Sequence, residues 1–498
     1  MNQNLTPSLI KDIRPGAASS NPENLIGFNG ESYFTTNFGL WKSNGTTEGT
    51  LEIDQEALFS DNSTFVITDL ITFGDRVLGI GGSAGGNVID NSIFATDFTP
   101  EKTVEIFSFG SDSRLTRSEV DNFTTANSNL FFVSNFIDNS SLRIPSITSS
   151  LIKTDGTEAG TSSVKTFDLR GGGSINELTN VNGTLFFNVP GTLAIADGFG
   201  EISTNNELWK SDGTEAGTVI VKDIRPGNDS SNPNDLTDIN GTLFFTANDG
   251  INGRELWKSD GTESGTVLIK DINPGEADSI KTTFNSEVSS SKLTDVNGTA
   301  FFTADDGTNG TELWKSDGTE SGTVLVEDIT PGSQGSEFDN FTNVNGILFF
   351  SVNDGSNGVE LWKSDGTESG TSLVKDINPG GNSSNPDNLT IFDNILYFTA
   401  DNGSNGAELW KSDGTESGTV LVGDINPGQS SANPEDLTVV DGELYFSADD
   451  GVNGRELWGL TEGGTDLILG GDSNDVLLGK EQDNIIDGLK GDDTLTGG

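Results

Sequence analysis

Short apolar stretches alternate with turns rich in glycine, asparagine and aspartate along most of this chain. Segment 236–275 shows the pattern well, because it contains four stretches of strand length, around residues 236–239, 242–247, 254–258 and 266–272. Asn240-Gly241, between the first two stretches, is a strong signal for a two-residue hairpin turn. Helical periodicity is not evident in any part of the chain. The pattern predicts units of four short antiparallel strands, named a to d in chain order.

The apolar residues within these stretches are consecutive rather than alternating. Leu243, Phe244 and Phe245 follow one another in strand b, and residues 267–269 of strand d are also all apolar. A strand with one face in water alternates apolar and polar residues, whereas an apolar run is typical of a strand covered on both faces. We therefore expect the four-stranded units to stack face to face.

The units recur, and the phrase E-L-W-K-S-D-G-T-E marks strand c of the clearest copies. With the weaker copies included, nine units follow one another at intervals of 48 to 58 residues, marked by Trp41, Phe94, Ile152, Trp209, Trp257, Trp314, Trp362, Trp410 and Trp458. Four strands per repeat of about 48 residues are typical of a β-propeller blade. Nine blades exceed the common range of about four to eight, and the copies between residues 50 and 150 are weak. We expect eight or nine blades, with the tryptophans in the core.

Both ends of the repeat region indicate how the ring closes. Residues 9–16 read L-I-K-D-I-R-P-G, which matches the end of a unit at 219–227, whereas the last repeat stops after strand c at Trp458. The N-terminal strand would then supply the missing outer strand of the last blade and remove an exposed edge. An open solenoid is the alternative, although such an array needs polar caps. The predicted fold is an all-β propeller over residues 5–460.

The repeat resembles the ELWxxDGT repeat family of bacterial extracellular proteins. The resemblance covers residues 5 to about 460 and is weak between residues 50 and 150. Because this family is recognised largely by its repeat, the resemblance implies a secreted or surface location more than a defined activity.

Composition excludes several classes of function. The chain has 77 acidic and 26 basic side chains, a formal net charge of −51, and neither histidine nor cysteine. It therefore has no Ser-His-Asp triad, no Cys-His dyad and no zinc site built on histidine or cysteine. Nucleic acid is not an expected partner, because binding phosphates requires a basic surface. No run of 18 apolar residues predicts a membrane span, and residues 1–16 lack the apolar core of a signal peptide.

Within the ring, three features are candidates for function. Insertions at 135–149, 189–205 and 276–291 all fall in b–c or d–a connections, on one predicted face of the ring, where they indicate either a binding surface or neutral drift. Asp-Gly-x-Asn-Gly-x-Glu loops could bring oxygen ligands together on calcium, although turn chemistry also explains them; the candidate sets are Asp249, Asn252 and Glu255, and Asp306, Asn309 and Glu312. In the Ser-Asp-Gly-Thr turns, the aspartate is expected to cap backbone amides; these residues are Asp212, Asp260, Asp317, Asp365 and Asp413.

After residue 470 the period changes to nine residues. Three segments, 470–478, 479–487 and 488–496, each carry a large apolar residue at the eighth position, namely Leu477, Ile486 and Leu495. Glycines allow tight turns, and carboxylates supply the oxygen ligands that calcium prefers. This pattern resembles the calcium-binding nonapeptide repeat of RTX proteins, which bacteria secrete.

The resemblance implies a short parallel β-roll at 466–498, in which each nonapeptide forms half a coil and Ca2+ lies between half-coils two apart. Asp475 and Asp493 would share one ion, and such a segment folds only when calcium binds. Because several repeat positions are substituted and only three nonapeptides occur, we expect at most one good site in a truncated repeat; a disordered acidic tail is the alternative. The candidate ligands are Asp475, Asp493, Asn484, Gly471, Asn474, Asp483, Gly491 and Asp492.

Together these features predict a secreted or cell-surface, calcium-binding, non-enzymatic protein with a structural or adhesive role. The nonapeptides and the missing signal peptide favour type I secretion, and the expected partners are calcium and a surface polysaccharide or another surface protein. A lectin-like propeller is the first alternative. A propeller glycoside hydrolase or lyase is the second, and its signature would be a carboxylate pair in the central channel that breaks the repeat.

Overall fold

The computed structural model describes two regions of the chain. Most of the repeat region is described, as residues 5–58, 65–83, 91–99, 103–108, 115–138, 146–170, 173–190, 206–281, 292–333 and 335–462. Towards the C-terminus it describes four short strands, β37 (Leu467–Leu469), β38 (Val476–Leu478), β39 (Ile485–Asp487) and β40 (Thr494–Thr496).

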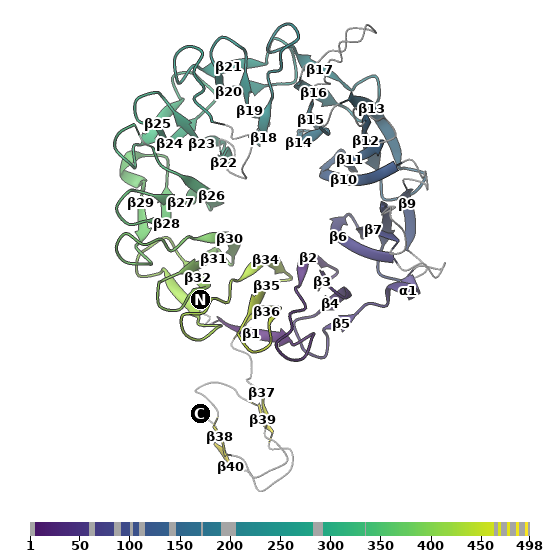
Figure 1. Cartoon of the computed structure of the whole chain (residues 1–498), viewed down its shortest axis with the longest axis vertical. Coiled ribbons are helices and arrows are strands. Elements are labelled where there is room, and N and C mark those ends of the chain that lie inside the picture. Colours follow the sequence, from purple (N-terminus) through teal and green to yellow (C-terminus); the bar gives the residue numbers. More distant parts are fainter. Residues whose placement is uncertain are drawn as a thin grey trace.

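Nine four-stranded antiparallel sheets form a closed ring (Figure 1). Strand a of each sheet lies nearest the ring axis and strand d at the periphery. The inner strands a are β2 (Glu23–Phe28), β6 (Phe65–Phe73), β10 (Leu115–Ala126), β14 (Asn176–Val181), β18 (Asn234–Ile239), β22 (Thr294–Val296), β26 (Phe338–Val344), β30 (Asp387–Phe392) and β34 (Glu435–Val440). Strands b are β3 (Glu31–Thr36), β7 (Arg76–Ser83), β11 (Asn129–Asp138), β15 (Thr184–Val189), β19 (Thr242–Asn248), β23 (Thr299–Asp305), β27 (Ile347–Asn353), β31 (Ile395–Asp401) and β35 (Glu443–Asp449).

The two outer strands of each sheet complete the blades. Strands c, which carry the marker phrase, are β4 (Gly39–Ser43), β8 (Asn91–Thr96), β12 (Ser146–Thr154), β16 (Glu207–Ser211), β20 (Arg254–Ser259), β24 (Thr311–Ser316), β28 (Val359–Ser364), β32 (Ala407–Ser412) and β36 (Arg455–Glu462). Strands d are β5 (Leu51–Glu52), β9 (Val104–Ser108), β13 (Ser162–Arg170), β17 (Val219–Lys222), β21 (Val267–Lys270), β25 (Val324–Glu327), β29 (Ser372–Lys375), β33 (Val420–Gly423) and, in the last blade, β1 (Leu5–Lys11). Helical structure in the described residues is limited to the single turn α1 (Gln55–Leu58) and a 3-10 turn at Glu368–Gly370.

The structure confirms the predicted propeller and settles the number of blades at nine. The weak repeats between residues 50 and 150 form two blades of their own, β6–β9 and β10–β13. Phe94 and Ile152 occupy the marker position on β8 and β12. Both side chains are buried, so a smaller apolar residue replaces tryptophan there without interrupting the ring.

The core lies between the blades, as the apolar runs predict. One buried cluster joins Phe186 and Leu208 of the fourth blade to Phe245 and Trp257 of the fifth. Phe245 is fully buried, and Trp257 is 5% exposed. Both faces of a blade are therefore covered by its neighbours, and the recurring tryptophan is a packing residue.

The N-terminal strand closes the ring, as predicted. β1 pairs antiparallel with β36, and Leu9 faces Trp458. Two glycines make room for it: a Cβ at Gly423 would lie 2.6 Å from Cγ of Pro7, and one at Gly459 would lie 2.8 Å from Cδ1 of Ile10. Most clean repeats carry lysine at the position of Gly423, and all carry lysine at the position of Gly459. These glycines therefore fit the last blade to a strand from the other end of the chain.

The four C-terminal strands pair in parallel, which agrees with the predicted β-roll fragment. β37 pairs with β39, and β38 pairs with β40. Val476 faces Thr494 in this register, so paired residues are two nonapeptides apart along the chain.

Candidate functional site

The marker phrase supplies contacts that join neighbouring blades. Lys210 of β16 donates a hydrogen bond from Nζ to the carbonyl oxygen of Gly261, in the c–d turn of the next blade, at 2.7 Å. The same contact forms at four further interfaces, between Lys153 and Gly213, Lys258 and Gly318, Lys315 and Gly366, and Lys363 and Gly414. This lysine and glycine therefore recur for a structural reason.

The Ser-Asp-Gly-Thr turns are hairpins whose aspartate caps the backbone, as expected. Oδ1 of Asp260 accepts hydrogen bonds from the amide and the hydroxyl of Thr262, at 2.8 and 2.7 Å. The hydrogen bond from the Thr262 hydroxyl is the main reason why the pKa of Asp260 lies below its usual value. Asp212, Asp317, Asp365 and Asp413 make the same contacts. None of these aspartates needs a ligand to explain its presence.

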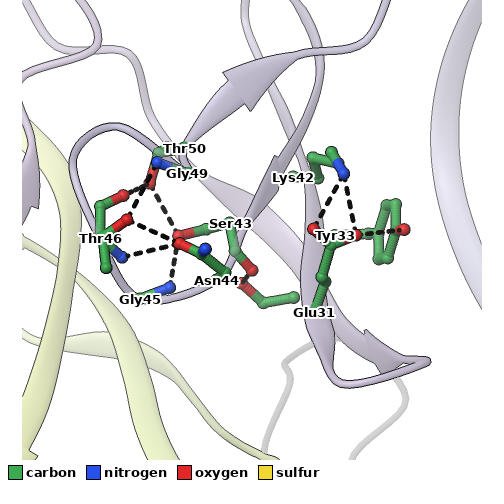
Figure 2. Close-up of polar contacts among 10 residues, drawn as sticks. Glu31, Tyr33, Lys42, Ser43, Asn44, Gly45, Thr46, Gly49 and Thr50 are labelled. Atoms are coloured by element: carbon green, nitrogen blue, oxygen red, sulfur yellow. Dashed lines mark hydrogen bonds and ion pairs between the residues drawn. The ribbon is translucent and has the colours of Figure 1, made fainter.

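The first blade shows a variation of this turn (Figure 2). Asn44 replaces the aspartate and accepts hydrogen bonds from the amide and hydroxyl of Thr46, at 3.1 and 2.8 Å. Lys42 does not reach a neighbouring turn in this blade but pairs with Glu31 at 2.8 Å. The next blade has Phe98 in its turn, and Tyr33 stacks on that ring with the centroids 4.0 Å apart. An aromatic contact thus replaces the lysine contact at this interface.

The glutamate that begins the marker phrase is a buried hydrogen-bond acceptor. Glu255 is fully buried; it accepts a hydrogen bond from the amide of Ile272 at 3.1 Å and one from the hydroxyl of Ser279 at 2.6 Å. Burial raises its pKa to about 7 despite these hydrogen bonds. The equivalent glutamates are all buried with raised pKa values, at Glu207, Glu312, Glu360, Glu408 and Glu456. Each holds the d–a connection against the start of strand c.

This arrangement does not support the calcium hypothesis for the Asp-Gly-x-Asn-Gly loops. Asp249 accepts hydrogen bonds from the amides of Ile251 and Asn252 through Oδ1, and from the side chain of Asn252 through Oδ2. Glu255 instead binds the d–a connection. In the next blade, Asp306 likewise accepts hydrogen bonds within its own loop, whereas Glu312 accepts one from the d–a connection. Among the described residues, no group of three or more acidic side chains is placed to hold a metal ion.

Eight residues of the C-terminal segment are the predicted calcium ligands. Asp475, Asp493, Asn484, Gly471, Asn474, Asp483, Gly491 and Asp492 all lie outside the described residues.

The insertions lie in the connections predicted for them, with one correction. Residues 135–138 and 146–149 are not loop but extend β11 and β12, since Asp138 pairs with Ser146. Of the other two insertions, residues 189–190 and 276–281 lie within the described ranges.

In each inner strand except the short β22, the pairing with strand b contains an irregularity that the sequence did not reveal. The register to strand b shifts at the same point, for example between Asn234 and Thr237. The residue at this position is left-handed in every blade except the second, with φ from 53° to 63°. It is asparagine, aspartate or glutamate in eight blades, at Asn24, Asp69, Asn122, Glu177, Asp235, Asn340, Asn388 and Asp436. Asparagine and aspartate are the residues that most readily adopt a left-handed backbone after glycine.

Several of these residues contact the inner strand of the next blade. The carboxylate of Glu177 accepts a hydrogen bond from the amide of Leu236 at 3.1 Å. Asn340 and Asn388 donate from Nδ2 to the carbonyl oxygens of Pro386 and Pro434, at 2.9 and 3.3 Å. The bulge therefore turns a polar side chain towards the adjacent blade.

The sixth blade departs from this rule, because β22 has no register shift and Lys292 occupies the equivalent position. Its ammonium pairs with Oδ1 of Asp339, on β26, at 2.7 Å. A hollow of about 380 Å3 opens at this point, lined by residues 235–237, 292–294 and 339–341 from the inner sides of three successive blades. The hollow is our candidate site. Its acidic residues follow the repeat and its lysine breaks it, so this is not the repeat-breaking carboxylate pair expected of a glycosidase.

Comparison with known proteins shows similarity at the level of fold. No family model and no curated protein matches the chain. The propeller domain of the Trilobed protease from Pyrococcus furiosus is 10% identical, with a TM-score of 0.32, and the match covers 72% of this chain and 96% of that one. A prolyl endopeptidase is 12% identical, with a TM-score of 0.39, over 84% of this chain. A puromycin-hydrolysing peptidase from Mycobacterium tuberculosis is 11% identical, with a TM-score of 0.36, also over 84%.

The chain spans 57% and 62% of the lengths of these two peptidases. In the part of the chain that the structure describes, no helix is long and apolar enough to cross a membrane.

Proposed function

We propose that this protein is a non-enzymatic, calcium-binding scaffold that is secreted or held at the cell surface and serves in attachment or matrix structure. The proposal joins the resemblance to the ELWxxDGT and RTX repeats with the closed ring. Export by a type I route is part of it, because RTX-like nonapeptides occur in the chain.

The observation that carries the calcium proposal is the register of the C-terminal strands. Val476 of β38 faces Thr494 of β40, which is two nonapeptides further along the chain. Asp475 and Asp493 precede these paired residues directly. A parallel pairing of this kind supports the proposal that the two carboxylates share one Ca2+, since calcium prefers several oxygen ligands brought together from turns.

The chemistry of the ring supports a scaffold rather than a catalyst. Its recurring lysines and aspartates make hydrogen bonds within and between blades. The sequence contains no histidine or cysteine, which removes the commonest general base and the commonest thiol nucleophile. The net charge of −51 keeps such a protein soluble and attracts divalent cations.

Calorimetric titration of Ca2+ into the full chain, with circular dichroism alongside, tests the calcium proposal. We expect about one bound ion and a gain of β-structure signal, both lost when Asp475 and Asp493 are changed together to asparagine. Asp249→Asn and Asp306→Asn in the ring loops form the matched control and are expected to leave binding unchanged. Binding that survives the tail variant, or no binding by the full chain, would contradict the assignment.

A further inference from the structure

We propose that the hollow around Lys292 is a binding site for a neutral sugar unit of a polysaccharide. For its biological setting this inference rests on the proposed attachment role, whereas its geometry is independent of the calcium tail. The hollow, of about 380 Å3, lies within the size range of small-ligand sites. Its lining residues lie on, or directly before, the inner strands of three successive blades.

The first argument is the position of Lys292. All eight equivalent positions carry asparagine, aspartate or glutamate. The lysine side chain does not stabilise a left-handed backbone conformation, yet Lys292 adopts it, with φ 53°. Backbone strain of this kind concentrates at ligand sites.

The polar groups of the hollow suit a hydroxyl-rich ligand. Lys292 has three N–H donors, and one of them goes to Asp339. The Lys292 side chain is 19% exposed and that of Asp339 is 65% exposed, so both can meet a ligand. Asp235 lines the hollow as well. A sugar hydroxyl can accept a hydrogen bond from an ammonium and donate one to a carboxylate at the same time. The hollow offers both kinds of partner.

The apolar groups of the hollow suit the C–H face of a sugar. Phe341 lines it together with Leu236 and Leu293. The ring of Phe341 contacts Phe338 edge-on, with the centroids 6.1 Å apart, and packs at a tilt against Phe350, with the centroids 5.6 Å apart. An aromatic side chain fixed in this way gives contact area at little cost in conformational entropy.

Charge selects neutral sugars over acidic ones. Two carboxylates and one ammonium leave the hollow itself acidic, and the whole chain carries −51. Uronic acids and sulfated sugars are therefore repelled, both on approach and within the site.

An array of neutral, acidic and amino-sugar oligosaccharides, probed with the full chain, tests the inference. We expect binding to neutral glycans, at least tenfold weaker for Lys292→Asn, which restores the residue type of the other blades and so preserves the fold. Phe341→Leu, the residue of most inner strands, should also weaken binding. Lys281→Asn is the matched control, because Lys281 forms an exposed ion pair with Asp305 and lies outside the hollow; it should bind as the unchanged chain does.

Four results would overturn the assignment. They are no binding to any glycan, binding unaffected by Lys292→Asn, equal weakening by Lys281→Asn, and binding that disappears when Ca2+ is chelated. The last result would place the contact in the tail. Because the ring residues are expected to bind glycan with or without Ca2+, failure of the calcium proposal and failure of this inference are separately visible.

Discussion

Six glutamates buried at the start of strand c should make the ring more stable in mild acid than at neutral pH. Burial raises the pKa of Glu255, Glu312 and Glu408 to about 7, from 4.5. Between these two values the folded protein holds protons that the unfolded chain has released. The free energy of unfolding must therefore fall as pH rises through this window and become level above about pH 7.5.

The size of the effect follows from proton linkage. At pH 6 a group with a folded pKa of about 7 and an unfolded pKa of about 4.5 changes the free energy of unfolding by about 1.2 kcal/mol per pH unit. Glu255, Glu312 and Glu408 together would contribute about 3.6 kcal/mol per unit if they titrate independently. The exposed turn aspartates, such as Asp260, have lowered pKa values, so their contribution is lost only below about pH 4.

Urea unfolding at pH 5, 6, 7 and 8, with EDTA present to remove any contribution of calcium, measures this dependence. We expect Glu255→Gln to make the free energy of unfolding less dependent on pH between pH 5 and 7. The loss should be about a third of the combined contribution of Glu255, Glu312 and Glu408. Glu263→Gln, at an exposed position of a c–d turn, should leave the slope unchanged. A free energy of unfolding that is flat or rises from pH 5 to pH 7 would refute the reasoning.

Three further changes test the packing of the ring. Phe245→Ala, at a fully buried position, should lower the free energy of unfolding by about 3–5 kcal/mol in a denaturant titration; a loss below 1 kcal/mol would contradict the interface core. Lys258→Met removes the donor to Gly318 and should cost about 1–2 kcal/mol in the same assay, whereas an unchanged midpoint would mean that the contact contributes nothing. Gly423→Lys restores the repeat residue but collides with Pro7, so β1 should detach; protease cleavage near the N-terminus should speed up, and unchanged cleavage would argue against the closure described.

The parts of the fold that the sequence predicts well are those set by local signals. Asn240-Gly241 takes left-handed φ values of 50° and 80° at both positions, which is the reason that this pair predicts a hairpin. The apolar run Leu243–Phe245 is buried throughout because neighbouring blades cover both faces. Closure by residues 9–16 was predictable as well, since the segment repeats an outer strand.

Contacts between distant residues could not be predicted in this way. Glu255 looked like a calcium ligand beside Asp249, but its partners lie 17 and 24 residues further along, at Ile272 and Ser279. The hollow is even harder to predict from the sequence, because it combines residues near 235, 292 and 339 from three repeats. One signal was available: Lys292 is the only basic residue at its position among the nine aligned repeats.

The buried glutamates also show where the long d–a connection before the sixth blade differs from the d–a connections of the other blades. Ser231 and Ser279 bind Glu207 and Glu255 at the same separation of 24 residues, so the connection is regular up to Ser279. From that serine to the bulge the chain takes thirteen positions instead of four. The extra residues therefore enter between Ser279 and Lys292, the one position of this set with a changed residue type. In a ring whose recurring side chains are engaged in holding blades together, a new ligand contact has to come from positions where the repeat is broken. Two such departures are adjacent here, namely the longer d–a connection and the lysine at position 292. We therefore expect ligand specificity to reside at this point of the inner wall.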